Sequence, residues 1–244
     1  MRAIPQKIHI LKFIGEQGIV TILDVDRHLF QSKKFSYTRV TMHELGIAHM
    51  KYREIPNGIW YIDDPKLYET LKSYFPALPP FEVRPVILHH VDHSLELNRI
   101  RTAFTKNNLV TIDEWWSENY IRALPESGFT SGKIPDAIFW RRRKDGTRQK
   151  LFLECERTFK SKERYEDIFR TYARREDVKD RNVLYLCQTP TIREDLQAIE
   201  QKLADTGKLE GAGLYFQFVT LESFYKAYEQ QPIKEPSCQS SNNG

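Results

Sequence analysis

The chain has 244 residues, of which 37 are lysine or arginine and 33 are aspartate or glutamate, so its formal net charge is +4. Hydrophobic residues make up 40% and charged residues 29%, a composition typical of a globular protein with one large or two smaller domains. No apolar run approaches the roughly 18 residues that cross a bilayer, and the first residues lack the apolar core of a signal peptide. We therefore expect a cytoplasmic protein without a membrane partner. The three cysteines are widely spaced, which disfavours a disulfide framework and a Cys-x-x-Cys zinc site.

The first part of the chain has the pattern of three short helices and a hairpin. Apolar residues at spacings of three and four predict helices over 4–17, 21–30 and 37–50, the last with Val40 on its buried side. Alternating residues predict strands over 51–55 and 59–62 around Asn57-Gly58, a strong hairpin signal. Three helices and a hairpin indicate a winged helix-turn-helix, and we assign residues 1–75 to such a DNA-binding domain.

In a winged helix-turn-helix the third helix enters the major groove and the hairpin lies on the phosphate backbone. The residues of this part that are placed to contact DNA are Lys33, Lys34, Tyr37, Arg39, His43, Lys51 and Arg53.

A proline-rich segment over 76–85 removes backbone donors and predicts a linker to a second domain over 86–231. Its helices are expected over 86–107, with Leu88 buried, and over 161–179, 192–206 and 221–229. Its strands are expected over 109–116, 134–140, 151–156, 183–187 and 214–219, with an irregular segment between the first two. The apolar run over 183–187 is typical of a buried parallel strand. This order predicts a mixed sheet flanked by helices, an α+β or α/β fold, and residues 232–244 are expected to be a disordered tail.

Three acidic residues fall on two neighbouring predicted strands. Asp136 begins one strand, and Glu154 and Glu156 end the next, where residues two apart share a face. Seventeen residues separate Asp136 from Glu154, enough for a strand, a turn at Asp145-Gly146 and a return strand. Because converging carboxylates repel one another, this pattern predicts a bound divalent cation, Mg²⁺ or Mn²⁺.

The turn between these two strands is strongly basic. A basic turn next to paired carboxylates is where a phosphate backbone needs cations, so its residues are further candidates for DNA contact. They are Arg141, Arg142, Arg143, Lys144 and Arg148.

The segments Pro135-Asp136 and Glu154-Cys155-Glu156 resemble the signature of the PD-(D/E)XK nuclease superfamily, whose core has the order αβββαβ. Together with the winged helix, His90, His93 and the Trp116-Ser117-Glu118 segment, they resemble the replication-relaxation family, over about residues 4–190. Within that family the layout is similar to the MOB-C class of plasmid mobilisation relaxases. The resemblance implies a PD-(D/E)XK-like fold, with Glu118, Asp136, Glu154 and Glu156 as functional acids.

The sequence departs from the nuclease signature at its lysine position, which holds Glu156. A lysine there offsets negative charge in the transition state, so a replacement is expected, and Lys160 and Lys162 are the nearest. Glu96 is an alternative to Glu118 as the first acid, and His89 with His93, one helical turn apart, is an alternative metal pair.

The resemblance implies a metal-dependent relaxase that nicks one strand of double-stranded plasmid DNA at a transfer origin, with an accessory mobilisation or coupling protein as a further partner. Its nucleophile is either water or a tyrosine, and Tyr120, Tyr165 and Tyr172 lie near the acids, the last two on an apolar helix face. The alternative is a plasmid replication or transcription regulator that binds DNA through its winged helix and has an inert nuclease fold.

Overall fold

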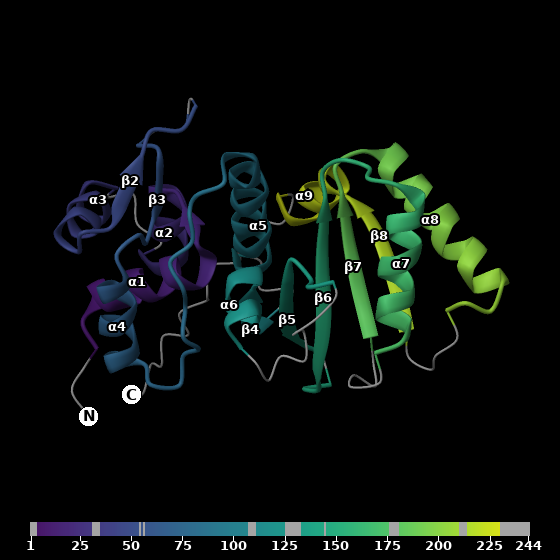
Figure 1. The fold of residues 1–244 in the computed structure, drawn as a ribbon, viewed down its shortest axis with the longest axis horizontal. Helices are drawn as coiled ribbons and strands as arrows, with labels where there is room; N and C mark the ends of the chain where they lie inside the picture. Colours follow the sequence, from purple (N-terminus) through teal and green to yellow (C-terminus); the bar gives the residue numbers. More distant parts are fainter. Residues whose placement is uncertain are drawn as a thin grey trace, which may run out of the picture.

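The computed structural model describes residues 4–30, 35–53, 55, 57–106, 111–124, 133–143, 145–175, 181–209 and 214–229. Helices and two sheets make up a mixed α+β fold, as the sequence predicted. Figure 1 shows the smaller sheet and its helices at one end of the molecule, α7 and α8 at the other, and α5 between them. None of the described helices combines the length and the apolar character that spanning a membrane demands.

The smaller sheet has three antiparallel strands in the order β1-β3-β2. A capping box between Thr21 and Asp24 starts the second helix, since each side chain binds the backbone N–H of the other residue. The elements of this part are α1 (Gln6–Gln17), β1 (Ile19–Val20), α2 (Ile22–Val25), the π-helix η1 (Asp26–Phe30), α3 (Phe35–Glu44), β2 (Ala48–Met50), β3 (Ile59–Tyr61) and α4 (Pro65–Tyr74).

The third helix is shorter than the sequence predicted. It ends at Glu44 because Gly46, at φ +70°, donates its N–H to the carbonyl of His43, and Ile47 donates to that of Met42. These two bonds form a Schellman motif, which closes a helix at a left-handed glycine. The expectation that Val40 is buried is also wrong: Met42 points into the core, and a residue two positions away on a helix points to the opposite side.

The hairpin pairs earlier residues than expected. Its strands are β2 and β3, in the register Ala48↔Tyr61 to Met50↔Ile59, so the strand predicted over 51–55 is wrong. Asn57 and Gly58 do adopt the positive φ angles, 63° and 59°, that an Asn-Gly turn requires. They stand at the end of a longer loop, of which residues 54 and 56 lie outside the described residues.

The larger sheet has five strands in the order β4-β5-β6-β7-β8. The first three strands run antiparallel, and β6, β7 and β8 run parallel, as the apolar run over 183–187 predicted. The elements of this part are α5 (Leu88–Lys106), β4 (Thr111–Ser117), α6 (Glu118–Ala123), β5 (Ala137–Arg142), β6 (Arg148–Glu156), α7 (Lys162–Ala173), β7 (Arg181–Cys187), α8 (Pro190–Asp205), β8 (Leu214–Thr220) and α9 (Leu221–Glu229).

Both faces of this sheet are covered by helices (Figure 1). Alternation along the strands sends Phe152 towards α7 and α8, and Leu153 and Cys155 towards α5 and α9. Cys155 and Cys187 are buried free thiols, as expected of strand residues, and Cys238 lies outside the described residues. Leu88, expected to be buried, is exposed in the first turn of α5.

The two parts of the chain are joined by packing as well as by the connecting segment. Leu78 and Phe81, within the proline-rich stretch, are buried in the core of the small sheet. The helix α6, which the sequence analysis left as irregular chain, docks on the end of α1: Ser117 donates to the carbonyl of Glu16, and the Asn119 amide donates to that of Gly15 at 2.6 Å. These bonds satisfy carbonyls that the end of α1 leaves free.

We predict that Gly58→Ala destabilises the protein by more than about 2 kcal/mol, because a side chain costs about 1–2 kcal/mol in the left-handed region and more where it meets backbone. A Cβ at Gly58 would lie 2.2 Å from the Met50 carbonyl oxygen. Gly46→Ala is the control: Gly46 has a similar φ but no atom within 4 Å of its added Cβ, so the loss is about 1 kcal/mol. Urea unfolding measures both, and equal losses would contradict the prediction.

Candidate active site

Asp136 is held in place by its backbone and by its side chain. Its N–H donates to the Leu153 carbonyl at 3.0 Å, and its own carbonyl accepts the N–H of Glu118 at 3.1 Å. One carboxylate oxygen, Oδ2, accepts the backbone N–H of Cys155 at 2.7 Å. The start of β5 is thereby fixed against β6 on one side and α6 on the other, with the Asp136 carboxylate at the edge where these elements meet.

A lysine that the sequence analysis did not select joins this carboxylate to the next one. Lys133 Nζ lies 2.7 Å from Glu154 Oε2 and 3.9 Å from Asp136 Oδ1. Glu154 is fully buried on β6, and its other oxygen accepts a hydrogen bond from the Tyr172 hydroxyl of α7. The structure therefore brings Asp136 and Glu154 to one cation, and that cation is an ammonium group of the chain itself.

Burial and this shared ammonium set the charges of the cluster. Burial raises the pKa of Glu154. The positive charge of Lys133 lowers this pKa and the negative charge of Asp136 raises it, and the result is a pKa of about 7. Burial would also raise the pKa of Asp136, but the Lys133 and His93 charges outweigh it and hold that pKa below its usual value. Burial lowers the pKa of Lys133, yet Glu154 and Asp136 raise it further, so Lys133 remains charged.

His93 of α5 completes the cluster on the open side. Its Nε2 lies 3.3 Å from Asp136 Oδ1. Burial would lower the His93 pKa, but the charges of Asp136, Glu118 and Glu156 raise it above the usual value. His93, Glu118 and Asp136 line a cleft of about 400 Å³ between α5, α6 and the small sheet. The acidic cluster is thus reached from a cleft, beside a histidine whose charged form the neighbouring acids stabilise.

The third predicted acid, Glu156, is paired separately. It is buried, and Lys160 Nζ lies 3.0 and 2.9 Å from its two carboxylate oxygens. Lys162, the other candidate lysine, is exposed at the start of α7. Of the two lysines that the sequence offered as replacements, the structure brings Lys160 to an acid of the signature.

The remaining acid candidates are separated by the fold. Glu118 begins α6, pairs with Arg122 and lines the same cleft as Asp136. Glu96 instead accepts a hydrogen bond from Tyr225 of α9, on the other side of the sheet. Glu118 is therefore the acid of this pair that lies next to the cluster.

The basic turn lies at the opposite end of the strands from the carboxylates. The register pairs Ala137 with Leu153 near the acids and Arg142 with Arg148 at the turn, five positions further along each strand. At about 3.3 Å per residue, this places the turn roughly 16 Å or more away. Arg141 donates to Gln149 at 2.8 Å, and Arg148 pairs with Glu114 at 3.2 Å. The expectation that the turn lies beside the acids is wrong, because a hairpin turn is by construction the far end of both strands.

The other residues predicted to contact DNA have different surroundings. Tyr37 and Arg39 are exposed on α3, and Lys51 is exposed after β2. His43 packs edge-on against Trp60, with ring centroids 4.7 Å apart. Arg53 is paired with Asp92 of α5 at 2.6 Å. Exposed Arg142 and Arg143 lie at the basic turn, whereas Lys33, Lys34 and Lys144 lie outside the described residues.

The three candidate tyrosines differ in their access to the cluster. Tyr165 and Tyr172 are buried in the core between the sheet and α7, as their apolar stripe predicted. Burial and the charge of Glu154 hold the pKa of Tyr172 well above its usual value. Tyr120 is partly exposed but stacks on Trp116 in a different cavity. None of these three hydroxyl groups is both accessible and beside the Asp136 carboxylate.

Within the part of the chain that is described, no group of three histidine, cysteine, aspartate or glutamate side chains is arranged to hold a metal ion. Of the alternative metal pair, His89 lies against the ring of His90, and His93 contacts Asp136. No family model, curated protein or solved structure matches the chain.

Sequence reasoning missed Lys133 although a signal for it was present. Lys133 lies three residues before Asp136, in a segment without regular structure, whereas Lys160 and Lys162 follow the strand that carries Glu156. An irregular segment has no repeating pattern of apolar residues, so the sequence does not predict where its side chains point. The available indication was that Lys133 is close in sequence to Asp136, on the N-terminal side of the motif rather than the C-terminal side.

We predict that stability falls by about 2–3 kcal/mol as pH rises from 4.5 to 6.5, and that Glu154→Gln removes most of this fall. The unfolded chain releases the Glu154 proton near pH 4.5 and the folded chain near 7, so the folded state binds more protons between these values. Urea unfolding at several pH values measures the slope. The exposed Glu194→Gln should keep the wild-type slope, and an unchanged slope in Glu154→Gln would refute the assignment.

Proposed function

We propose that this chain is a metal-dependent DNA endonuclease that nicks one strand of a plasmid transfer origin, with Asp136, Glu154 and Lys133 at its reaction centre. The observation that carries the proposal is the contact of one lysine ammonium with two strand-borne carboxylates. An aspartate, a glutamate and a lysine are the residue types of the PD-(D/E)XK signature. In this chain they come together in the fold, although Glu156 occupies the lysine position of the sequence motif.

The order of elements supports the same proposal. Helix α5, strands β4, β5 and β6, helix α7 and strand β7 come in the order of the αβββαβ core that the resemblance implies, with the short helix α6 inserted between β4 and β5. The Pro135-Asp136 segment stands immediately before the second strand of this series, and Glu154 stands near the end of the third. The winged helix-turn-helix of the proposal corresponds to α1–α3 with the hairpin of β2 and β3.

The donor set fits a small divalent cation. Mg²⁺ is usually held by one or two carboxylates together with water and substrate phosphate oxygens. Asp136 and Glu154 would supply these carboxylates, since both already face one cation. When bound, the ion would polarise the scissile phosphate and lower the pKa of the attacking water.

The residues around the carboxylates would each contribute to cleavage. The Lys133 ammonium would offset the negative charge that develops on the phosphate oxygens. His93 lies on the cleft side of Asp136, and the neighbouring acids raise its pKa, so its imidazolium form would donate a proton to a leaving oxygen there. Since Tyr165 and Tyr172 are buried, water is the nucleophile in this proposal. Hydrolysis does not conserve the energy of the phosphodiester, so the site would cut a strand without rejoining it.

A second function has its own supporting observation. Lys133 and Lys160 already neutralise the buried acids from within the chain, which reduces the attraction of the site for a metal ion. This favours the alternative of a plasmid replication or transcription regulator, which would bind DNA through the winged helix and use the acid and lysine pairs only for stability.

A nicking assay separates the two functions. A supercoiled plasmid carrying the DNA that flanks the coding sequence is incubated with protein and Mg²⁺ or Mn²⁺. We predict open circles with the wild type and a loss of rate of about 100-fold or more in Asp136→Asn and Lys133→Met, because each removes a charge beside the reacting phosphate.

The matched control is Lys226→Met, which removes an exposed lysine of α9 that pairs with Glu222. It should nick like the wild type. A protein that shifts the mobility of this DNA but produces no open circles with either metal would be a regulator, and the cleavage proposal would be abandoned. Full nicking by Asp136→Asn would refute the site.

We predict that Arg39→Ala and Lys51→Ala each weaken DNA binding and lower the slope of log affinity against log salt by about one, since each removes one phosphate contact. Fluorescence anisotropy on a labelled duplex at several salt concentrations measures the slope. The control is Lys202→Ala on α8, at the other end of the molecule (Figure 1). An equal change in all three variants would show that α3 and the hairpin do not contact the phosphates.

A further inference from the structure

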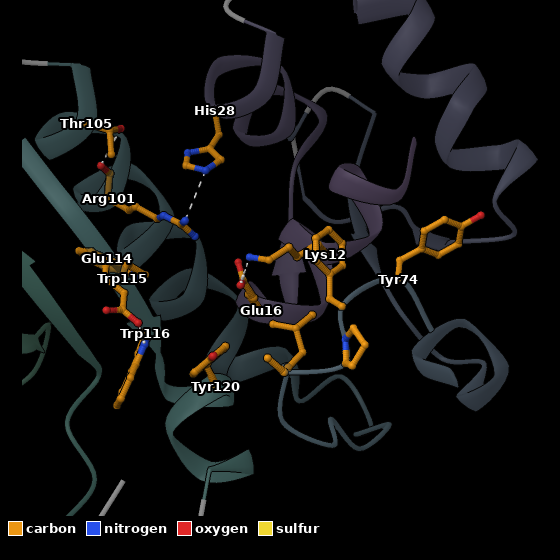
Figure 2. Close-up of a pocket in the computed structure, with 14 residues that line it drawn as sticks. Lys12, Glu16, His28, Tyr74, Arg101, Thr105, Glu114, Trp115, Trp116 and Tyr120 are labelled. Atoms are coloured by element: carbon orange, nitrogen blue, oxygen red, sulfur yellow. Dashed lines mark hydrogen bonds and ion pairs between the residues drawn. The ribbon is translucent and has the colours of Figure 1, made fainter. Parts of the chain in front are cut away.

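A second cavity, of about 600 Å³, lies between α1, η1, α5 and the start of α6, on the far side of Trp115 from the acidic cluster. Figure 2 shows Arg101, His28, Glu16 and Tyr120 around its interior. The proposed nuclease function uses none of these residues.

Arg101 is the unusual residue of this cavity. Its side chain comes from α5, is only 9% exposed, and lies over the rings of Phe13 and Trp115 at 5.1 and 6.0 Å. Its Nη2 lies 3.3 Å from His28 Nε2 (Figure 2). Its Nε and Nη1 have no hydrogen-bond partner among the residues that the structure describes. A buried guanidinium with free N–H groups needs an acceptor, because buried donors are almost always satisfied.

No neighbouring group that the structure describes is hydrogen-bonded to Nε or Nη1, although the charge of Glu16 acts on the guanidinium and opposes the lowering of its pKa by burial. Burial, with the charges of Arg101 and Lys12, lowers the pKa of His28 to about 3, so His28 is neutral and cannot balance the charge of Arg101. Glu16 is paired with Lys12, and Glu114 accepts from the indole of Trp116 at 2.7 Å. Trp115 adds another buried donor, Nε1, that is unpaired within the described chain. Among the described residues, the cavity thus holds three unpaired buried donors beside the carboxylates of Glu16 and Glu114.

Aromatic side chains form part of the wall. Trp116 and Tyr120 stack with centroids 5.5 Å apart, and Phe75 closes another side. A cavity of this size, lined by both aromatic and charged side chains, has room for a small organic ligand that carries a ring and a charged group. Flat rings stack on such side chains, whereas free arginine donors bind phosphate or carboxylate oxygens.

We propose that this cavity binds a nucleoside monophosphate, with the phosphate on Arg101 and Trp115 Nε1 and the base against Trp116 and Tyr120. The same chemistry is offered by a free nucleotide and by the 5′-phosphorylated end of a DNA strand. The proposal is independent of cleavage, because its residues lie outside the acidic cluster.

Calorimetry with AMP, adenosine and inorganic phosphate tests the proposal. The wild type should bind AMP at least tenfold more tightly than adenosine or phosphate alone. Arg101→Met, which keeps the length of the stem, should weaken AMP binding at least tenfold, and Trp115→Phe, which keeps a ring but removes the donor, should weaken it by a smaller factor. Arg99→Met is the matched control, since Arg99 is exposed on the same helix and pairs with Glu96. It should bind AMP like the wild type.

Thermal unfolding verifies that each variant is folded. If Arg101→Met does not fold, Trp115→Phe still tests the proposal. Competition by a 5′-phosphorylated trinucleotide distinguishes a strand end from a free nucleotide, and either result supports the shared chemistry. Equal affinity for AMP and adenosine, AMP binding that is unchanged in Arg101→Met, or no AMP binding at millimolar concentration would overturn the proposal.

Discussion

The ammonium of Lys133 is the group on which the centre of the larger sheet depends. Two carboxylates are buried where β5 begins and β6 ends, and an isolated buried charge costs several kcal/mol. Lys133 lies within ion-pair distance of both, and the N–H of Cys155 and the hydroxyl of Tyr172 satisfy their remaining oxygens. Breaking such a buried arrangement typically costs about 3–5 kcal/mol, so the local fold and any chemistry of the cluster require the same residue.

Most elements of the fold followed from the sequence because their signals are local. The helix α9 was predicted with its observed bounds, and the buried parallel strand β7 was evident from its apolar residues. The errors arose where one residue overrides a periodicity. Gly46 ends α3 although apolar residues continue beyond it, and Ser117 starts the short helix α6 by accepting the N–H of Tyr120. Both are capping effects, and the helical spacing of apolar residues does not reveal where a helix is capped.

The candidate site was predictable only in part. Acids two apart on a strand must share a face, and the placement of Asp136 near Glu154 follows from pairing β5 with β6. The choice of cation does not follow, since Lys133 reaches the acids from irregular chain. The cavity around Arg101 was equally hidden, because its walls come from segments about 100 residues apart that meet only in the folded protein.

The attachment of α6 to the end of α1 has a geometric consequence. Ser117 and Asn119 bind carbonyls in the last turn of α1, and Asn98 binds the carbonyl of Ile19 at 2.8 Å, so three hydrogen bonds join the two parts of the molecule at this point. These contacts set the distance between the exposed face of α3 and the carboxylates of Asp136 and Glu154. Lengthening the connecting segment after Phe81 would leave that distance unchanged.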